Sequence, residues 1–342
     1  MYVFLYLISI CFGEPWSVIY PKGVYHNYPQ QIHPQKWLVE QNKAFAIPPQ
    51  TNISKFIVQC IHTRDFLLRN PNAPLGMLSQ WGYTNKHRIN ALTKIIDTAT
   101  QNKKLLHDPL WWHKHFRHFI LHDHSKKSKP SSIRLTKYVV YQVQGSPKKT
   151  KTHTQALWAV KNDTSDNILH QFSRIDILNG ILEKQQHTDP LVWLTKNDAL
   201  EAQMQGTIEV ELPNKSKRLF NVHRHNNMPY QKGISSENQL RYWYFREVHT
   251  IYGWGKTTKV SIQKDVSFAG DVDNLGFGSL IWISKEDHSS LGLIVDTGGA
   301  FKPNLGQLDW FIGTVRDKKD FIQKSKAYPA RAQVGFLILR DP

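Results

Sequence analysis

The sequence predicts a mainly β fold of the α+β class with a helical N-terminal part, and three observations lead to that prediction. From about residue 52 to residue 121, apolar side chains recur at helical spacing. From about residue 138, short segments rich in β-branched and aromatic residues alternate with turn residues. A second cluster of such segments fills the C-terminal third of the chain. Two β units separated by a loop-rich stretch at 226–237 are therefore the simplest division.

The helical part is predicted from three consecutive stretches. In each of the first two, apolar residues return about every third or fourth position, which places them on one helical face. The third begins at Asp108-Pro109, in the cap-then-proline order of a helix start. The apolar residues of the first two stretches are Phe56, Cys60, Phe66 and Leu67, then Ile89, Leu92, Ile95 and Ile96.

The third predicted helix, 107–124, carries a cluster of histidines. His115, His118 and His122 would share one helical face, at i, i+3 and i+7, and such a face could bind zinc. No cysteine ligand lies nearby in the sequence. We therefore expect an amphipathic helix with solvated histidines, and neither a metal site nor a cofactor.

The β part is predicted as two groups of strands with turn residues between them. The polar, Pro-containing segment 125–132 reads as the link that leads into it. The predicted strands are 138–143, 155–160, 191–194, 207–212 and 219–223 in the first group, and 259–268, 279–283, 291–295 and 334–339 in the second.

The opening run, residues 1–13, is apolar and has the length of a signal-peptide core, with Gly13 just before the polar switch. It is too short to span a bilayer, so we expect export to the periplasm or cell envelope. Because no Lys or Arg precedes the run, a buried strand stays the alternative. Ile10 precedes Cys11 where a lipoprotein signal has a small residue, which argues against a lipid anchor; peripheral outer-membrane association stays open.

The charge balance predicts a polyanionic partner. Lys and Arg number 44 against 27 Asp and Glu, which gives a formal net charge of +17. Nucleic acid, an anionic membrane and the bacterial wall all fit. The basic residues are scattered, and no helix-turn-helix, zinc knuckle or RNP-like stretch appears, so we expect no nucleic acid partner. Without the leader, Cys60 is the one thiol left, which excludes an internal disulfide and a cysteine metal site.

Three acids each border an apolar strand in the C-terminal third. Asp271 follows Ala-Gly, Asp296 opens an Asp-Thr-Gly-Gly turn, and Asp309 stands in Leu-Asp-Trp-Phe. A single acid of this kind is most often a turn or cap residue. Three in one region are better explained by a site.

The order and spacing of these motifs resemble the C-terminal three-aspartate domain of the lytic murein transglycosylase A family. Segments 173–180, 202–207 and 226–230 are similar to that family's second-domain motifs, and the resemblance runs from about residue 105 to the C-terminus. It implies a double-psi β-barrel with a second β domain inserted across a groove. The implied parts are a leader (1–13), an N-terminal helical part with the first barrel strands (14–146), the inserted domain (147–238) and the C-terminal barrel portion (239–342).

The resemblance also implies an activity. It is that of a lytic exotransglycosylase, which cleaves the β-1,4 bond between N-acetylmuramic acid and N-acetylglucosamine in peptidoglycan and forms 1,6-anhydromuramic acid, without metal or cofactor. Asp309 matches the catalytic acid, which at neutral pH needs a raised pKa. The protein would be a monomer bound to glycan strands. The implied supporting residues are Asp271, Asp296, Thr297, Gly298 and Gly299, and the implied substrate-binding residues are Thr136, Tyr138, Gln205, Gly206, Ala300 and Lys302.

Departures from the family pattern keep other functions open. Lys137 and Val140 replace a Gly and a Glu, and Val266 replaces an Arg. A catalytically weakened wall-binding or scaffold protein is therefore one alternative. An aspartic-protease-like enzyme built on the Asp296 turn is the other, and it would need a dimer because the chain has no second Asp-Thr/Ser-Gly.

Overall fold

The computed structural model describes residues 33–42, 48–123, 131–161, 169–229, 231, 233–255, 258–286, 288–298, 301 and 304–340, and the predicted leader and most of the predicted link at 125–132 lie outside them. The described chain forms two compact units. Unit 1 contains Val140–Ile251 and Thr314–Asp320. Unit 2 contains the described residues up to Val139, together with Tyr252–Gly313 and those from Phe321 onward. The range 140–251 contains the predicted insertion at 147–238 and extends past both its ends.

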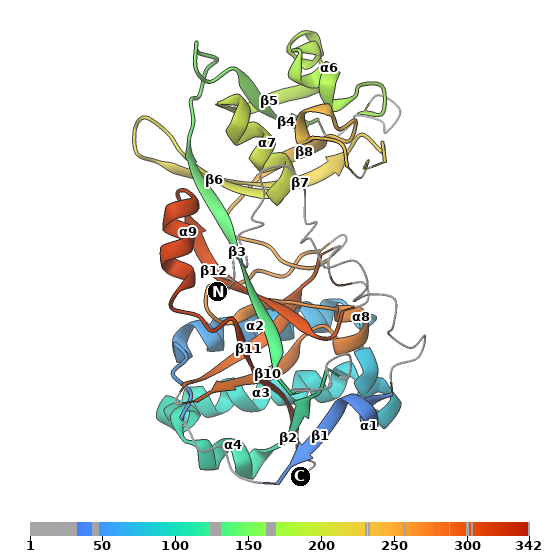
Figure 1. The fold of residues 1–342 in the computed structure, drawn as a ribbon, viewed down its shortest axis with the longest axis vertical. Helices are drawn as coiled ribbons and strands as arrows, with labels where there is room; N and C mark the ends of the chain where they lie inside the picture. The colour runs from blue at the N-terminus through green and yellow to red at the C-terminus, as the bar shows by residue number, and fades with distance from the viewer. Residues whose placement is uncertain are drawn as a thin grey trace, which may run out of the picture. The chain divides into compact units, whose positions relative to one another are not determined.

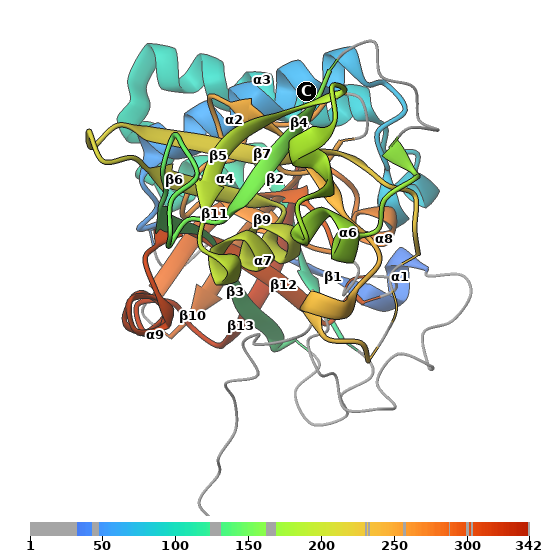
Figure 2. The ribbon, with the colours of Figure 1, turned by 90° about the horizontal axis from the view of Figure 1, so that it is seen from above.

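Two long helices form the helical part of unit 2. Helix α2 (Ile53–Arg69) begins at Asn52, whose side chain accepts a hydrogen bond from the Lys55 amide at 3.1 Å. Figures 1 and 2 show α2 beside α3 (Asn85–Asn102). Both bury the apolar face that the sequence predicts, so these two helices are confirmed. The shorter helices of unit 2 are α1 (Pro34–Trp37), η1 (Gly76–Trp81), η2 (Lys103–His107), α4 (Pro109–His115) and α8 (Val272–Leu275), and α9 (Lys318–Ser325) is shared between the units.

The predicted helix at 107–124 is wrong beyond its first two turns. Helix α4 begins as predicted, with the Asp108 carboxylate accepting from the Leu110 amide at 2.9 Å, but it ends at His115. The chain then continues as β2 (Phe116–Leu121), because that segment pairs on both sides, with β1 (Leu38–Gln41) and β13 (Arg331–Leu339).

This change removes the predicted histidine face. His118 lies in β2, is 9% exposed, and its ring lies over Gly335, where an added Cβ would meet the imidazole at 1.7 Å. Burial lowers the pKa of His118 to about 4, so its ring is neutral. Among the residues that the structure describes, no group of three or more His, Cys, Asp or Glu side chains could hold a metal ion.

The strands of unit 2 close into a ring. In order they are β13, β10 (Ser279–Lys285), β11 (His288–Asp296), β9 (Ser267–Ala269), β12 (Gln307–Val315) and β3 (Ile133–Gln144). The ring closes because β3 also pairs with β13, with Ile133 opposite Ala332. A sheet that closes on itself is a barrel, and its wall here is continuous through the described residues.

One predicted strand of this unit is mostly wrong. Only Ser267 and Phe268 of the predicted 259–268 lie in a strand, β9. The residues before them form a loop. The buried Gln59 side chain binds two backbone groups of this loop: it donates to the Ser261 carbonyl (3.1 Å) and accepts from the Gln263 amide (2.8 Å).

Unit 1 is built around four strands with a hydrophobic core. They are the later part of β3 (from Val140), β6 (Thr207–Glu211), β7 (Lys217–His225) and β8 (Trp243–Val248), and β4 (Gln155–Val160) pairs with β5 (Thr188–Leu194) in a smaller sheet. Leu157, Phe220 and Phe245 are fully buried in one core cluster. The helices are α6 (Arg174–Leu178), η3 (Ile181–Lys184), α7 (Lys196–Gln205) and η4 (Ser236–Asn238).

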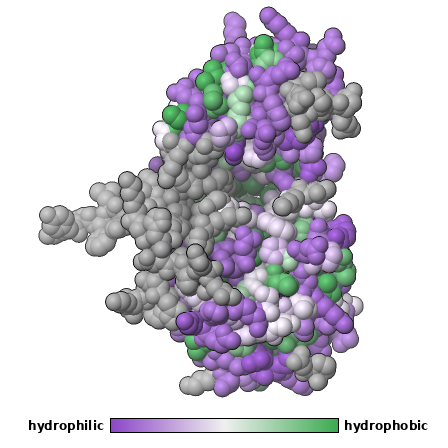
Figure 3. All heavy atoms as spheres, turned by 90° about the vertical axis from the view of Figure 1, so that its right-hand side faces the viewer, coloured by the Kyte–Doolittle hydropathy of each residue, from purple (hydrophilic) through white to green (hydrophobic). Residues whose placement is uncertain are grey.

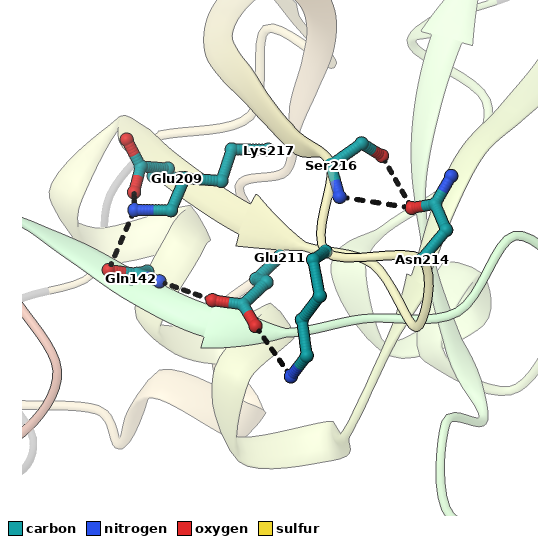
Figure 4. Close-up of polar contacts among 7 residues, drawn as sticks. Gln142, Glu209, Glu211, Asn214, Ser216 and Lys217 are labelled. Carbon is teal, nitrogen blue, oxygen red and sulfur yellow. Dashed lines mark hydrogen bonds and ion pairs between the residues drawn. The ribbon is translucent and has the colours of Figure 1, made fainter.

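Polar pairs fix the register of β3, β6 and β7 at one end of unit 1 (Figure 4). Lys217 on β7 contacts Glu209 on β6 at 3.1 Å. Gln142 on β3 donates to Glu211 at 2.9 Å, and Asn214 accepts from both the amide and the hydroxyl of Ser216 in the turn. Polar pairs that are this exposed each contribute little to the free energy of unfolding, so their role is mainly to align the strands.

The surface is predominantly polar. Hydrophilic residues cover most of the described surface in Figure 3, and the most exposed large apolar side chains are Leu110 (67%) and Leu68 (60%). Within the described residues, no helix has the length and apolar character needed to cross a membrane.

Candidate active site

Asp296 and Asp309 lie at the same level of the barrel wall, on either side of the short strand β9. Ala269 of β9 is the register partner of Asp296 on one side and of Asp309 on the other. Two strand spacings separate the backbones of the two acids by roughly 10 Å. The two acids are therefore held by backbone pairing rather than by loops.

The Asp296 turn is tied to the Asp271 turn through backbone and side-chain bonds. The Gly270 amide donates to the Asp296 carbonyl at 3.0 Å, and the Thr297 hydroxyl donates to the Gly270 carbonyl at 2.7 Å. The Thr297 amide donates to the Asp296 carboxylate at 2.9 Å. Thr297 thus holds the turn together, while Gly298 follows it with a partly exposed backbone.

Asp309 is buried and its carboxylate has a buried partner. Its exposed fraction is 4%, and Oδ1 accepts a hydrogen bond from the Gln307 side-chain amide at 2.9 Å. The same Gln307 nitrogen donates to the Thr136 hydroxyl of β3 at 2.8 Å. Gln307 and Asp309 are two positions apart on β12, so they share one face of that strand.

Tyr138 completes this face from β3. Its ring packs on Phe311, with centroids 5.1 Å apart, and its buried hydroxyl interacts with the Asp296 carboxyl group. Burial and the carboxylates of Asp296 and Asp309 raise the pKa of Tyr138 well above its ordinary value. The phenol is therefore protonated and available as a donor beside both acids.

Burial determines the protonation of the two acids. It raises the pKa of Asp309 to about 6, against the lowering effects of the Gln307 hydrogen bond and of the positive charges of Arg134 and Lys137. Burial also raises the pKa of Asp296, whose side chain keeps part of its surface accessible, and the Asp309 charge adds to that rise. Both carboxyl groups thus hold a proton at higher pH than an ordinary aspartate.

Lys137 is an unusual neighbour for an acid. Its ammonium donates to the carbonyls of Leu135 (3.1 Å) and Pro329 (2.8 Å). Burial lowers the pKa of Lys137 to about 8, and the Asp309 charge opposes that effect. At neutral pH the cation favours the ionised form of Asp309.

Asp271 performs a structural task. It is the N-cap of α8, where its carboxylate accepts from the amide (3.2 Å) and the side chain (2.7 Å) of Asn274. It also accepts from the Asn304 amide at 3.0 Å, which ties α8 to the segment that leads into β12. These bonds occupy its oxygen atoms.

Replacing Asp271 with Ala is expected to lower the free energy of unfolding by about 1–2 kcal/mol, because the cap and the Asn304 contact are lost together. Denaturant unfolding would measure this effect. Asp273→Ala, on the exposed side of the same helix, is the control and should change stability by about 0.5 kcal/mol or less. Equal effects of the two changes would contradict the capping role.

The other residues implied by the resemblance lie either in unit 1 or outside the described residues. Gln205 and Gly206 belong to unit 1, where Gln205 donates to Glu201 at 2.8 Å and Gly206 ends α7 in the left-handed conformation. Gly299, Ala300 and Lys302 lie outside the described residues.

The comparison with solved structures finds this fold in lytic transglycosylases. A membrane-bound lytic murein transglycosylase from Agrobacterium tumefaciens superposes with a TM-score of 0.63 at 16% identity, over 89% of this chain and 98% of that one. Escherichia coli MltA with bound chitohexaose gives 0.61 at 13% identity, over 89% and 95%. MltA from Neisseria gonorrhoeae gives 0.57 at 11% identity, over 84% and 86%.

The chain has the MltA fold. The predicted resemblance is thereby confirmed for the fold, and the predicted α+β class with it. No protein-family model and no curated protein matches the sequence. At such low identity, the MltA fold is retained while most side chains differ.

Gln307 is the residue of this MltA-fold site that the sequence analysis missed. A polar residue inside the apolar segment 305–312 is an available signal, because in a strand a residue two positions from Asp309 shares the face of the acid. Arg134 was missed for a different reason: its charge acts on Asp309 from a strand 175 residues earlier, as the numbers of the two residues show.

Proposed function

We propose that this protein is a peptidoglycan lytic transglycosylase in which Asp309 is the general acid and then the general base. The observation that supports this most directly is a single carboxyl group, 4% exposed with its pKa raised to about 6, placed in the wall of a closed barrel beside a second carboxyl group. The fold shared with the MltA enzymes supports the same substrate class.

The reaction needs one proton carrier. Protonated Asp309 gives its proton to the glycosidic oxygen, and the bond between that oxygen and C1 of the muramic acid residue breaks. The 6-hydroxyl of the same sugar bonds to C1 and closes the 1,6-anhydro ring. Its proton passes to the Asp309 carboxylate, which restores the acid. No water is consumed. Burial keeps Asp309 protonated at higher pH than an ordinary aspartate, and Asp296 is the supporting carboxyl group on strand β11.

The finer parts of the proposal come from the resemblance. They are the double-psi course of the barrel strands, the inserted domain at 147–238, exolytic action on the β-1,4 bond, the subsite roles of Thr136, Tyr138, Gln205, Gly206, Ala300 and Lys302, and the supporting roles of Thr297, Gly298 and Gly299. Export to the periplasm or envelope and a monomeric state belong to the same proposal.

Digestion of purified sacculi tests the class of reaction. Mass spectrometry of the products should show muropeptides that end in 1,6-anhydromuramic acid. Reducing ends in their place would identify a hydrolase. An absence of soluble products, with the protein still bound to sacculi, would favour the scaffold alternative.

The pH dependence follows from the raised pKa of Asp309. Because the acid must be protonated to start the reaction, kcat/KM should fall about tenfold per pH unit once the pH rises through about 6. Initial rates on soluble glycan strands between pH 4 and pH 9 would measure this. A profile that stays flat from pH 5 to pH 8 would contradict the role of Asp309 as the acid.

A further inference from the structure

A buried hydrogen-bond relay joins Thr136, Gln307 and Asp309. Gln307 is 2% exposed, and its amide nitrogen gives one hydrogen to Asp309 Oδ1 (2.9 Å) and the other to the Thr136 hydroxyl (2.8 Å). Its carbonyl oxygen is buried and has no hydrogen-bond partner among the described residues. Burying a carbonyl oxygen without a hydrogen-bond partner lowers the free energy of unfolding. The two hydrogen bonds that the amide nitrogen donates therefore hold the Gln307 side chain in its buried position.

We propose that Gln307 is a positioning residue for the reaction: it keeps Asp309 Oδ1 as a hydrogen-bond acceptor, so that the proton transferred to and from the glycan is carried on Oδ2. The inference rests on the proposed function and adds the identity of the reacting oxygen atom. Gln307 acts through Asp309 and need not touch the glycan.

The count of hydrogen bonds fixes the orientation of the amide. With the nitrogen toward Asp309 and Thr136, one acceptor, the Gln307 carbonyl oxygen, stays without a partner. In the opposite orientation the amide nitrogen would occupy that place with two unsatisfied hydrogens, and an ionised Asp309 would face a carbonyl oxygen. The observed orientation therefore satisfies more groups in both protonation states of the acid.

The relay acts on Asp309 in the same direction as the nearby positive charges and against the effect of burial. From β3, Arg134 and Lys137 favour its ionised form, and the buried phenol of Tyr138 is nearby. From β11, Asp296 is the titratable neighbour, and burial, with a smaller contribution from Asp309, raises its own pKa. Gln307 is the one side chain of β12 with a described hydrogen bond to the carboxyl group, and its donation stabilises the carboxylate.

Gln307→Met tests the inference, because methionine fills the same volume without a donor. Titration of the Asp309 carboxyl carbon by NMR, assigned by comparison with Asp309→Asn, should show its pKa about one pH unit higher in the variant. The alkaline limb of the pH profile should move by the same amount. At the pH optimum kcat should fall about tenfold with KM unchanged, since the lost interaction orients the acid and does not bind the glycan.

Gln307→Glu is the second variant and covers a failure of Gln307→Met to fold. It keeps the length and polarity of the side chain, and its carboxylate should raise the pKa of Asp309 further. The control is Gln59→Met, another buried glutamine of unit 2 with hydrogen bonds on both ends of its amide. It should lower stability and leave the Asp309 titration unchanged.

The outcomes separate the inference from the proposed function. An Asp309 pKa that is the same in the wild type and in both Gln307 variants overturns the inference, whatever the activity. A shifted pKa with a shifted activity profile supports both. A shifted pKa in a protein that releases no anhydro-sugars supports the relay and overturns the transglycosylase function.

Discussion

Asp309→Asn is expected to abolish glycan cleavage and, at the same time, to stabilise the folded protein above pH 6. General acid catalysis contributes about 10²–10⁴-fold, so the rate of product release should fall by at least that factor. The fold should be unaffected, because an Asn oxygen can still accept from Gln307 in the buried site.

The gain in stability follows from the raised pKa. The pKa of Asp309 is about 6 in the folded protein and near the ordinary aspartate value of 3.8 in the unfolded chain. The folded state therefore binds the proton more tightly, and this contribution is fully present below pH 3.8 and lost as the pH rises through 6. At pH 8 the ionised Asp309 costs up to about 3 kcal/mol, which the neutral Asn avoids.

Denaturant unfolding at pH 4 and pH 8 checks this prediction. The variant should differ little from the wild type at pH 4 and should be more stable at pH 8. Asp97→Asn, on an exposed position of α3, is the matched control and should have the same small effect at both pH values. A loss of activity without any pH-dependent gain in stability would mean that burial does not raise the pKa of Asp309.

Gly276→Ala is expected to cause a large loss of stability in unit 2. Gly276 ends α8 with a φ of +84°, and an added Cβ would lie 2.2 Å from the Arg88 guanidinium and 2.7 Å from the Leu75 carbonyl. Arg88 is 2% exposed and donates to the Pro74 carbonyl at 3.1 Å, so it cannot move aside without losing buried bonds. The combined cost should be at least about 3 kcal/mol.

A second glycine of unit 2 isolates the steric part of that cost. Gly82 has a φ of +75°, and an added Cβ there would meet no atom within 4 Å. Gly82→Ala should therefore cost only the backbone penalty, about 1–2 kcal/mol. Thermal unfolding of both variants makes the comparison. Equal losses would contradict the clash with Arg88 and Leu75.

Local patterns predicted the parts of the fold that local interactions determine. The helix start at Asp108-Pro109 was found because a cap and a proline act within one turn. The strand at 155–160 was found with its observed bounds because turn residues precede it and β-branched or aromatic side chains fill it.

Long-range pairing decided the parts that the sequence analysis got wrong. Phe116–Leu121 has apolar residues at a spacing that suits a helix, but strands from both ends of the chain lie on either side of it. The segment before Ser267 is a loop that the side chain of Gln59, about 200 residues earlier, binds at two backbone groups. Neither influence leaves a mark within a window of ten to twenty residues.

The candidate site also has parts that the sequence predicts and parts that only long-range pairing determines. Asp296 and Asp309 were predicted as site residues from the order of three motifs. That both are register partners of Ala269 depends on how the strands pair, which a local sequence pattern does not show. Asp271 was grouped with them as a supporting carboxylate, and the structure gives it the bonds of a helix cap.

The two strands that carry the acid and its partners also join the two compact units. Strand β3 leaves unit 2 after Val139, one residue beyond Tyr138, and β12 leaves it after Gly313, four residues beyond Asp309. Gly313 has a φ of +92°, a backbone conformation that glycine adopts at little cost in free energy. The backbone that positions the Asp309 carboxyl group is therefore also the backbone that links the two units.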